Sequence, residues 1–568
     1  MATIFQRLVG LETEYAIRFR PASFFAPPTR RYQLYQELVQ SLRGRLPVVR
    51  ALHFKEGVFI ATGGAVWFET ERIASEGGLI EGSTPECRGP QQVVTWQRAQ
   101  DRLLEDAAAA AQVGGEFRLL KNCRDSEDNV YGAQENYEAT LAHRGGLLLW
   151  RIGLVVLLPL VLLTWVLLMG MVLAILLYLA LAGIACLALR LLPMDRKRLT
   201  ITLLGRDLAE GRETGSPLPG WMEWLVLWGA RLAGAPLAIG LLVLTHLTAF
   251  RAIRQQGLAF LVSRSILGGS GMLDSEGRFQ IAEKAPAINC VVGLGGYLWD
   301  RPIFNFGHFF KAVSVETVLA PGDYAGLFRA RQRLQIGIGD SNMSETAEYL
   351  RVGTTLLVLD AIEAGYLKQA PRVCRPIRAM RQICLDPQLE ERVRLRRGAC
   401  WTAVELQRDY LEACRAFVAD QPDAPPEARE VLRRWQQTLD ALEQDRSLLV
   451  GSLDWVTKRY LIERAGGEAA WSVRKKIDLR YHELSDEGYY RIWSRTGTTS
   501  TLVDDADLQR ALRTPPPGTP ATTRGWYIRE FAGADEPLFA HWRRLVIGRG
   551  RGAKIIRLTR LGGRRPSD

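Results

Sequence analysis

The feature that most restricts the fold of this chain is a run of 38 residues without a charged side chain, from Ile152 to Leu189. A helix that crosses the hydrocarbon core of a bilayer needs about 20 apolar residues, so a single span leaves about half of the run unexplained. Two spans that turn near Met169-Gly170-Met171 account for all of it. A buried helical hairpin of a soluble protein would carry charges on at least one face. We therefore expect a transmembrane helical hairpin over about 152–189.

The residues that flank this run predict its orientation. Basic residues stand on both sides of it, namely Arg144, Arg151, Arg190, Arg196, Lys197 and Arg198. Positive charge at both ends predicts a hairpin whose two feet are in the cytoplasm. We expect an integral protein of the cytoplasmic membrane, with its catalytic part in the cytoplasm and lipid as a partner of the insert.

A third apolar stretch, Trp221 to Phe250, is less regular because it contains Glu223, Arg231 and Pro236. If the segments before and after the insert form one fold, they lie on the same side of the membrane, and the number of crossings is even. The third stretch is then an interfacial helix or a second hairpin, and we favour the interfacial helix.

Composition adds broad limits. A chain of 568 residues suggests two or three structural units. The net charge of +12 favours anionic partners, and we expect no nucleic acid among them. The eight cysteines include no CxxC pair and no zinc-ligand spacing, which is typical of reduced thiols in a cytosol-facing protein. The first ten residues lead directly into a strand pattern, so we expect no cleaved export signal.

The segment Leu8 to Ile17 has the alternation of a strand, with Glu12 and Glu14 on one face. Two neighbouring acids on one face repel each other unless a cation lies between them. A cation site and a solvated edge face are both compatible with this pattern.

Other elements follow from periodicity and turn chemistry. We expect helices over 34–44, 93–112, 403–418, 425–443 and 448–464, and strands over 117–122 and 332–340. Asn342 and Glu345 are spaced as a capping box for a further helix. The chain has no GxxxxGK[ST] motif and no GxGxxG that opens a helix. Nucleotide chemistry would therefore depend on carboxylates that hold magnesium.

Several long blocks resemble one family, the Pup ligases and Pup deamidases/depupylases. The blocks are GLETEY (10–15), LLKNCRDSEDNVYGAQENY (119–137), RPIFN (301–305), IGDSNMSET (338–346), PIRAMRQI (376–383), LDWVTKRYL (453–461), IDLRYHEL (477–484) and TRGWY (523–527). They occur in family order over nearly the whole chain, except for an insert at about 144–256.

The resemblance implies an α+β fold like that of glutamine synthetase, in which a curved antiparallel sheet packed with helices binds ATP and Mg²⁺. It divides the chain into a catalytic domain over 1–143 and 257–485, a membrane insert over 144–256, and a small C-terminal domain with a basic tail over 486–568. The family phosphorylates the C-terminal glutamate of Pup, a small modifier protein, and a target lysine then displaces the phosphate. A paralogue removes Pup or deamidates it.

By this resemblance the cofactors are ATP and Mg²⁺, and the partners are a Pup-like modifier, its target proteins and a proteasome-related protein. The implied metal ligands are Glu12, Glu14 and Glu81. The implied nucleotide-site residues are Asn122, Glu135, Asn136, Arg333 and Asn342.

The sequence departs from the family pattern at several positions. Gln134 stands where the family has His, and Gly307 and His308 replace an Arg and an Asp. The catalytic Asp of the family aligns with Thr70, so Glu69, Glu71 and Glu76 are the candidates for the catalytic base. The loop insertion typical of the deamidase is absent, which favours a ligase. A deamidase/depupylase and an inactive binding protein remain the alternatives.

Overall fold

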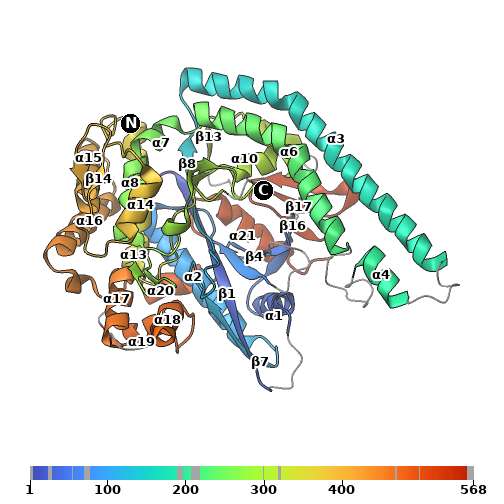
Figure 1. The fold of residues 1–568 in the computed structure, drawn as a ribbon, viewed down its shortest axis with the longest axis horizontal. Helices are drawn as coiled ribbons and strands as arrows, with labels where there is room; N and C mark the ends of the chain where they lie inside the picture. The colour runs from blue at the N-terminus through green and yellow to red at the C-terminus, as the bar shows by residue number, and fades with distance from the viewer. Residues whose placement is uncertain are drawn as a thin grey trace.

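The computed structural model describes residues 4–23, 29–53, 55–69, 77–188, 196–205, 218–297, 300–316, 321–466, 470–497, 499 and 501–558. A large sheet runs through the centre of the molecule and helices pack against it (Figure 1). Its path of hydrogen-bonded strands is β11-β12-β13-β8-β1-β5-β4-β3-β2-β16-β17-β18, and β6 and β7 also pair with β1.

The strands come from three separate parts of the sequence. The first part contributes β1 Leu8–Pro21, β2 Val48–Ala51, β3 Gly57–Ile60, β4 Ala65–Glu69, β5 Leu79–Ser83, β6 Cys87–Arg88, β7 Gly115–Leu120 and β8 Ala133–Thr140. The strands after the insert are β11 Cys290–Gly293, β12 Pro302–Asn305 and β13 Arg331–Ile336. The C-terminal strands are β16 Leu538–Ala540, β17 Arg544–Ile547 and β18 Lys554–Arg557. The predicted α+β fold is confirmed, although the sheet is mixed: β11 with β12 and β16 with β2 are parallel pairs.

The two parts of the predicted catalytic domain join in this sheet, because β8 pairs antiparallel with β13, with Tyr137 opposite Leu334. The C-terminal strands continue the same sheet through β16 rather than forming a separate one. The domain limits drawn from the sequence stay predictions.

Long helices cover one face of the sheet and form the main core. They are α2 Gly89–Ala110, α13 Glu345–Ala364, α15 Ala403–Ala419, α16 Pro426–Gln444 and α17 Asp454–Arg464, and α1 Arg31–Arg43 flanks the sheet. Buried polar groups bind α2 to the sheet, where the Tyr15 hydroxyl donates to Asp101 over 2.7 Å. The predicted capping box at Asn342 is wrong. Ser344 is the N-cap of α13, and its side chain accepts from the Ala347 amide at 3.4 Å.

The predicted turn near Met169-Gly170-Met171 is also wrong. The segment is one continuous helix, α3 Arg144–Ala188. A single glycine costs a helix only about 1 kcal/mol relative to alanine, and the neighbouring Leu, Met and Val side chains offer no alternative to the helical hydrogen bonds. The chain has turned back by α4 Arg196–Leu204, where the Leu203 carbonyl accepts from Tyr178 of α3 at 3.1 Å, and α6 Gly220–Thr248 then returns along α3.

The helical hairpin is therefore formed by α3 and α6, which run side by side along the edge of the molecule (Figure 1). Two glycines allow close approach: a Cβ on Gly153 would lie 2.3 Å from Leu244, and one on Gly240 would lie 2.6 Å from Leu157. The two ends of the insert meet where the Phe250 amide donates to the Leu141 carbonyl at 2.6 Å. Two long helices, α3 and α6, thus return the chain to its starting point, and the even number of membrane crossings stays a prediction.

Both helices are long and apolar enough to cross a membrane by length and composition. Among the described residues, the hydrogen bonds from α3 to the parts of the chain outside the insert come from its first half. There the Trp150 indole donates to the Leu327 carbonyl at 2.8 Å, and the Tyr324 hydroxyl donates to the Leu154 carbonyl at 2.7 Å.

Candidate functional site

The candidate site lies on the face of the sheet opposite the long helices, and the alternation of β1 creates it. Val9, Leu11, Thr13 and Tyr15 are buried toward the helices, whereas Glu12 and Glu14 point to the other face, which we call the open face. The predicted pairing of these two acids on one strand face is confirmed.

The neighbouring strand adds a third acid. Glu81 of β5 stands directly opposite Glu14 of β1 in the antiparallel register. Side chains in such pairs are about 5 Å apart, so two carboxylates repel each other. Burial, and then the charge of Glu81, raise the pKa of Glu14 to about 7. The Gly132 amide donates to the Glu14 carboxylate at 2.6 Å and opposes this shift.

This pKa predicts how stability changes with pH. Between about pH 4.5 and about pH 7, folded Glu14 retains a proton that the unfolded chain has lost, so the folded state loses stability as pH rises through this window. We expect the melting temperature of the metal-free protein to fall over this range and to fall less in E14Q. Thermal unfolding in matched buffers measures this difference, and parallel profiles of the two proteins would contradict it.

Two cations of the chain contact these acids. The Lys55 ammonium is 2.6 Å from Glu81 and also pairs with Glu69 at the end of β4. Burial disfavours the charged form of Lys55, but Glu81 and Glu69 outweigh it and raise the lysine pKa. The Arg333 guanidinium is 2.9 Å from Glu12 and donates to the Asn136 amide oxygen at 2.7 Å. The open face therefore carries three acids, Glu12, Glu14 and Glu81. Arg333 pairs with Glu12, and Lys55 pairs with Glu81.

Two residues that depart from the family pattern lie near these groups: Gln134 is next to Glu12, and His308 is near Arg333. Gln134 is opposite Glu12 in the sheet, and its amide oxygen accepts from Gln335. Gln335 also donates to Glu12 at 3.3 Å. His308 lies in the short helix α10 Gly307–Lys311, where burial, and then the charges of Arg333 and Arg543, hold its pKa well below the usual value. Glu12 thus contacts one amide, that of Gln335, and one cation, Arg333.

Three predicted nucleotide-site residues are not on this face. Glu135 alternates to the helix side of β8 and is fully buried. There it forms ion pairs with Arg264 at 2.6 Å and Arg351 at 3.0 Å. Burial alone would raise the pKa of Glu135, but the two arginines lower it to about 2. The structure therefore does not bring Glu135 together with Glu12 and Glu14 on the open face.

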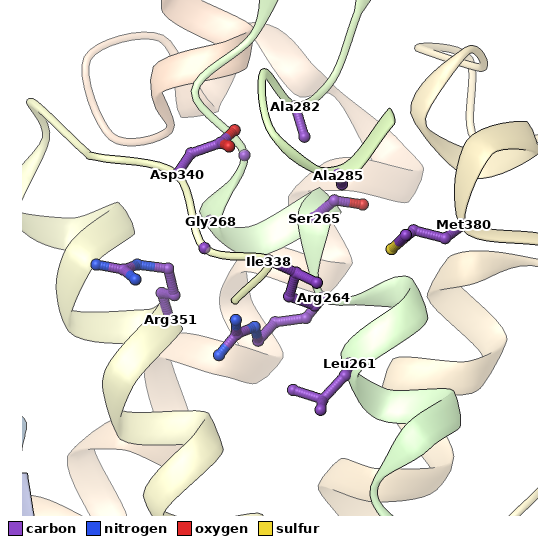
Figure 2. Close-up of a pocket in the computed structure, with 12 residues that line it drawn as sticks. Leu261, Arg264, Ser265, Gly268, Ala282, Ala285, Ile338, Asp340, Arg351 and Met380 are labelled. Carbon is purple, nitrogen blue, oxygen red and sulfur yellow. The ribbon is translucent and has the colours of Figure 1, made fainter. Parts of the chain in front are cut away.

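The cavity beside these arginines is small. It measures about 10 Å³, which is room for about one water molecule. Arg351 and Met380 lie on opposite sides of it in Figure 2. It cannot hold a nucleotide, and the group around Glu135 is structural.

Asn122 and Asn342 are also buried. The Asn342 amide donates to Asp454 at 2.9 Å and to the Gly268 carbonyl at 3.2 Å, so it joins the segment before α13 to α17. The Asn122 amide donates to the Arg124 carbonyl in the turn after β7. Asn136 and Arg333 are the predicted nucleotide-site residues that the structure brings next to Glu12.

Of the candidate bases, Glu69 lies at the end of β4, paired with Lys55. Glu71 and Glu76, like Thr70, lie outside the residues that the structure describes. Glu69 is in register with Leu79 of β5, two positions from the Trp67–Glu81 pair, so it belongs to the same face as Glu81.

Within the described ranges, no group of three His, Cys, Asp or Glu side chains is arranged to hold a metal ion. The chemistry of the donors nevertheless fits Mg²⁺, which prefers carboxylate oxygens. The raised pKa of Glu14 indicates that added positive charge would be favourable there. Lys55 and Arg333 would have to turn away from Glu81 and Glu12 for all three acids to serve.

Sequence reasoning missed Lys55, Gln335 and Lys284. Lys284 donates to the Ala133 carbonyl at 2.9 Å beside Glu14, and burial lowers its pKa. Lys55 and Lys284 lie in connecting segments without a periodic pattern, so no local signal marks them. Gln335 could have been found, because it shares the face of Arg333 two residues earlier.

Comparison with known proteins gives one consistent result. The model of the Pup-ligase protein family matches residues 7–546. The chain is 37% identical to a depupylase of Acidothermus cellulolyticus over 50% of this chain and 56% of the relative. It is 25% identical to a Pup–protein ligase of Xylanimonas cellulosilytica over 95% of this chain and 93% of the relative. The matched region thus spans little more than half of the depupylase.

Solved structures agree on the fold. The complex of the prokaryotic ubiquitin-like protein Pup with its ligase PafA has a TM-score of 0.66 at 19% identity, covering 99% of this chain and 90% of that chain. PafA in complex with ADP has a TM-score of 0.60 at 18% identity, covering 96% and 93%.

Proposed function

This chain belongs to the Pup-ligase protein family, and we propose that it is a membrane-anchored ligase. The enzyme uses Mg²⁺ and ATP to join the C-terminal glutamate of a Pup-like modifier to lysine side chains of target proteins, through an acyl phosphate. The observation that carries the proposal is the group of acids Glu12, Glu14 and Glu81 on adjacent strands of the open face, with Arg333 and Asn136 beside them.

Each residue of this group has a distinct role in the proposed reaction. Phosphoryl transfer depends on positioning and on neutralisation of charge, and Mg²⁺ bound with ATP would supply that charge. Glu12, Glu14 and Glu81 hold the metal, and Arg333 orients phosphate oxygens through its fork of N–H donors. Asn136 fixes Arg333, because its amide oxygen already accepts from the guanidinium.

The attacking lysine must lose a proton, since its ammonium form is not a nucleophile. Glu69 is the described acid nearest in sequence to the position of the family's base, and Glu71 and Glu76 are the further candidates. Glu69 can accept the proton once Lys55 leaves it, so the pair of Lys55 with Glu69 and Glu81 keeps the site in a resting state.

A depupylase is the second candidate, and the 37% identity to the Acidothermus cellulolyticus depupylase favours it. Both activities attack a carbonyl of the same modifier. They differ in whether ADP forms in proportion to product.

The anchor is the helical hairpin, whose exposed side chains are apolar from Ile152 to the end of α3. We place the protein in the cytoplasmic membrane with its catalytic part in the cytoplasm. A proteasome-related protein is a further expected partner.

The test incubates the purified full chain with Mg²⁺, ATP, a lysine-bearing target and a small disordered protein that ends in Gly-Gly-Glu. Mass spectrometry should detect a conjugate and an equal amount of ADP. We expect one of the variants E69Q, E71Q and E76Q to lose at least about tenfold in turnover with nucleotide binding intact. Release of modifier without proportional ADP would instead identify a depupylase. Absence of both reactions would contradict an enzymatic function.

A further inference from the structure

The pairing of α3 with α6 fixes which faces of the hairpin remain free. Contacts follow one another along both helices, from Gly153 beside Leu244 to Tyr178 beside Trp221, whose rings are 5.9 Å apart. Each helix therefore has a side turned to its partner over nearly the whole length of α6.

α6 has two further sides of opposite character. The residues buried against the protein include Gly234, Leu237, Ala238 and Leu241. Most of the exposed large side chains form a stripe on the other side, namely Trp221, Leu225, Trp228, Leu232, Ile239, Val243 and Leu247. Trp224 and Leu227, in the first two turns, are also exposed but lie outside this stripe. This outer stripe continues over the half of α6 that packs on the protein.

The two charged residues of α6 start from positions outside the outer stripe, although the Arg231 guanidinium reaches back over the Trp228 ring, 5.6 Å from its centroid. Glu223 precedes Gly234 by 11 residues, or about three turns, and Arg231 precedes Ala238 by seven, or about two turns. Both therefore lie on the side that faces the protein. The Arg231 carbonyl there accepts a hydrogen bond from Tyr297. The hairpin is amphipathic as a unit, with an apolar outer face, at whose edge Arg231 packs on Trp228, and the protein on the inner face.

The free length of the hairpin is too short to cross a bilayer. The protein contacts the hairpin as far as Trp165, which donates to the Val313 carbonyl at 3.2 Å, and Arg231, whose carbonyl accepts from Tyr297. Beyond this level α6 has only 11 residues to its start at Gly220, which is about 17 Å of helix, against about 30 Å of hydrocarbon. α3 alone runs further, to Ala188.

The segment that joins the helices also disfavours crossing. Tyr178 donates to the Leu203 carbonyl of α4 at 3.1 Å, so α4 folds back to the level of Trp221. α4 begins with Arg196, Lys197 and Arg198, and moving such residues through hydrocarbon is strongly unfavourable.

We infer that the hairpin lies in the plane of the membrane, with the outer faces of α3 and α6 in the acyl chains of one leaflet. The inference rests on the membrane anchoring proposed above and corrects its geometry. The protein and α4 then lie on the same side of the bilayer. The exposed Arg144 and Arg151 at the start of α3 contact anionic headgroups, and the tryptophans of the outer stripe lie at the interface, where their rings are favoured.

The inference is tested by determining on which side of the membrane α4 lies. The exposed native thiols Cys374 and Cys400 mark the side of the catalytic part. In the full chain with C374S and C400S, the exposed Thr202 is changed to Cys and treated with a membrane-impermeant maleimide. We expect T202C to be labelled in inside-out vesicles and protected in intact spheroplasts, with the same sidedness as wild-type Cys374 and Cys400. Labelling from the opposite side, or only after detergent, would overturn the inference.

A second pair of variants tests the outer face. V243K/L247K places two charges on the stripe at the level of the docked protein. An in-plane hairpin should lose at least about tenfold in its ratio of membrane to soluble protein after carbonate extraction, whereas a crossing by the distal half would leave this ratio unchanged. Retention in the membrane with loss of self-association would show that a second copy covers the stripe, which also overturns the inference. If wild-type protein itself is soluble in carbonate, the membrane anchoring has failed rather than its geometry.

Discussion

Replacing Glu135 with Leu should destabilise the protein by about 3–5 kcal/mol, because it leaves Arg264 and Arg351 buried without their counter-charge. Both guanidinium groups are almost completely shielded from water by the surrounding helices. The Tyr137 hydroxyl, which donates to Glu135 at 2.6 Å, also loses its partner. Thermal and denaturant unfolding of the full chain in detergent would measure the loss.

The matched control is E138L, three residues along the same strand and on the open face. Glu138 pairs with the partly exposed Arg331 at 3.5 Å, and pairs of this kind contribute about 1 kcal/mol or less. We expect a large change for E135L and a small one for E138L. If E135L instead kept its stability and lost only its response to nucleotide, Glu135 would face the nucleotide after all.

The second large effect concerns ligand binding at the open face. A ligand that binds only the folded state stabilises it by about 2.7 kcal/mol at a hundredfold excess over its Kd. Mg²⁺–ATP should therefore raise the melting temperature of the wild-type protein, and Mg²⁺ should be required. E14Q and E81Q should abolish the rise, because each removes an anionic oxygen from the directly opposed pair.

Replacing Lys55 and Arg333, the two cations that pair with these acids, tests the assignment further. K55M frees Glu81 and Glu69 of their competing ammonium, so its apparent affinity for Mg²⁺ should rise, whereas R333M should weaken binding of the nucleotide phosphates. E138Q, an acid on the same face but outside the group, should respond as the wild type does. If Mg²⁺–ATP raised the melting temperatures of E14Q and E81Q as much as that of the wild type, the assignment of these acids as metal ligands would be wrong. If ATP raised the melting temperature without Mg²⁺, binding would not require the metal.

Whether a predicted residue belongs to the open-face site depends on the side of the sheet to which its side chain points. Glu12 and Glu14 could be placed together from the sequence because the period of a strand is two and both belong to one strand. The same rule, applied to β8, separates Glu135 from Asn136. The resemblance of the block 119–137 to the family implied that both residues belong to the nucleotide site. Neighbours on a strand, however, point to opposite sides of the sheet.

The sequence by itself determined the family, the α+β class, the acid pair of β1 and the presence of a long apolar insert between two parts of one fold. These properties are local or follow from long matching blocks. Only the tertiary structure decided the partner of the apolar helix, because Ile152–Leu189 is equally apolar on every side and carries no mark of where it turns. The place of Lys55, and the burial of Asn122 and Asn342, were likewise decided by long-range packing. In both cases the contact energy comes from residues far apart in the chain, which no periodicity or spacing records.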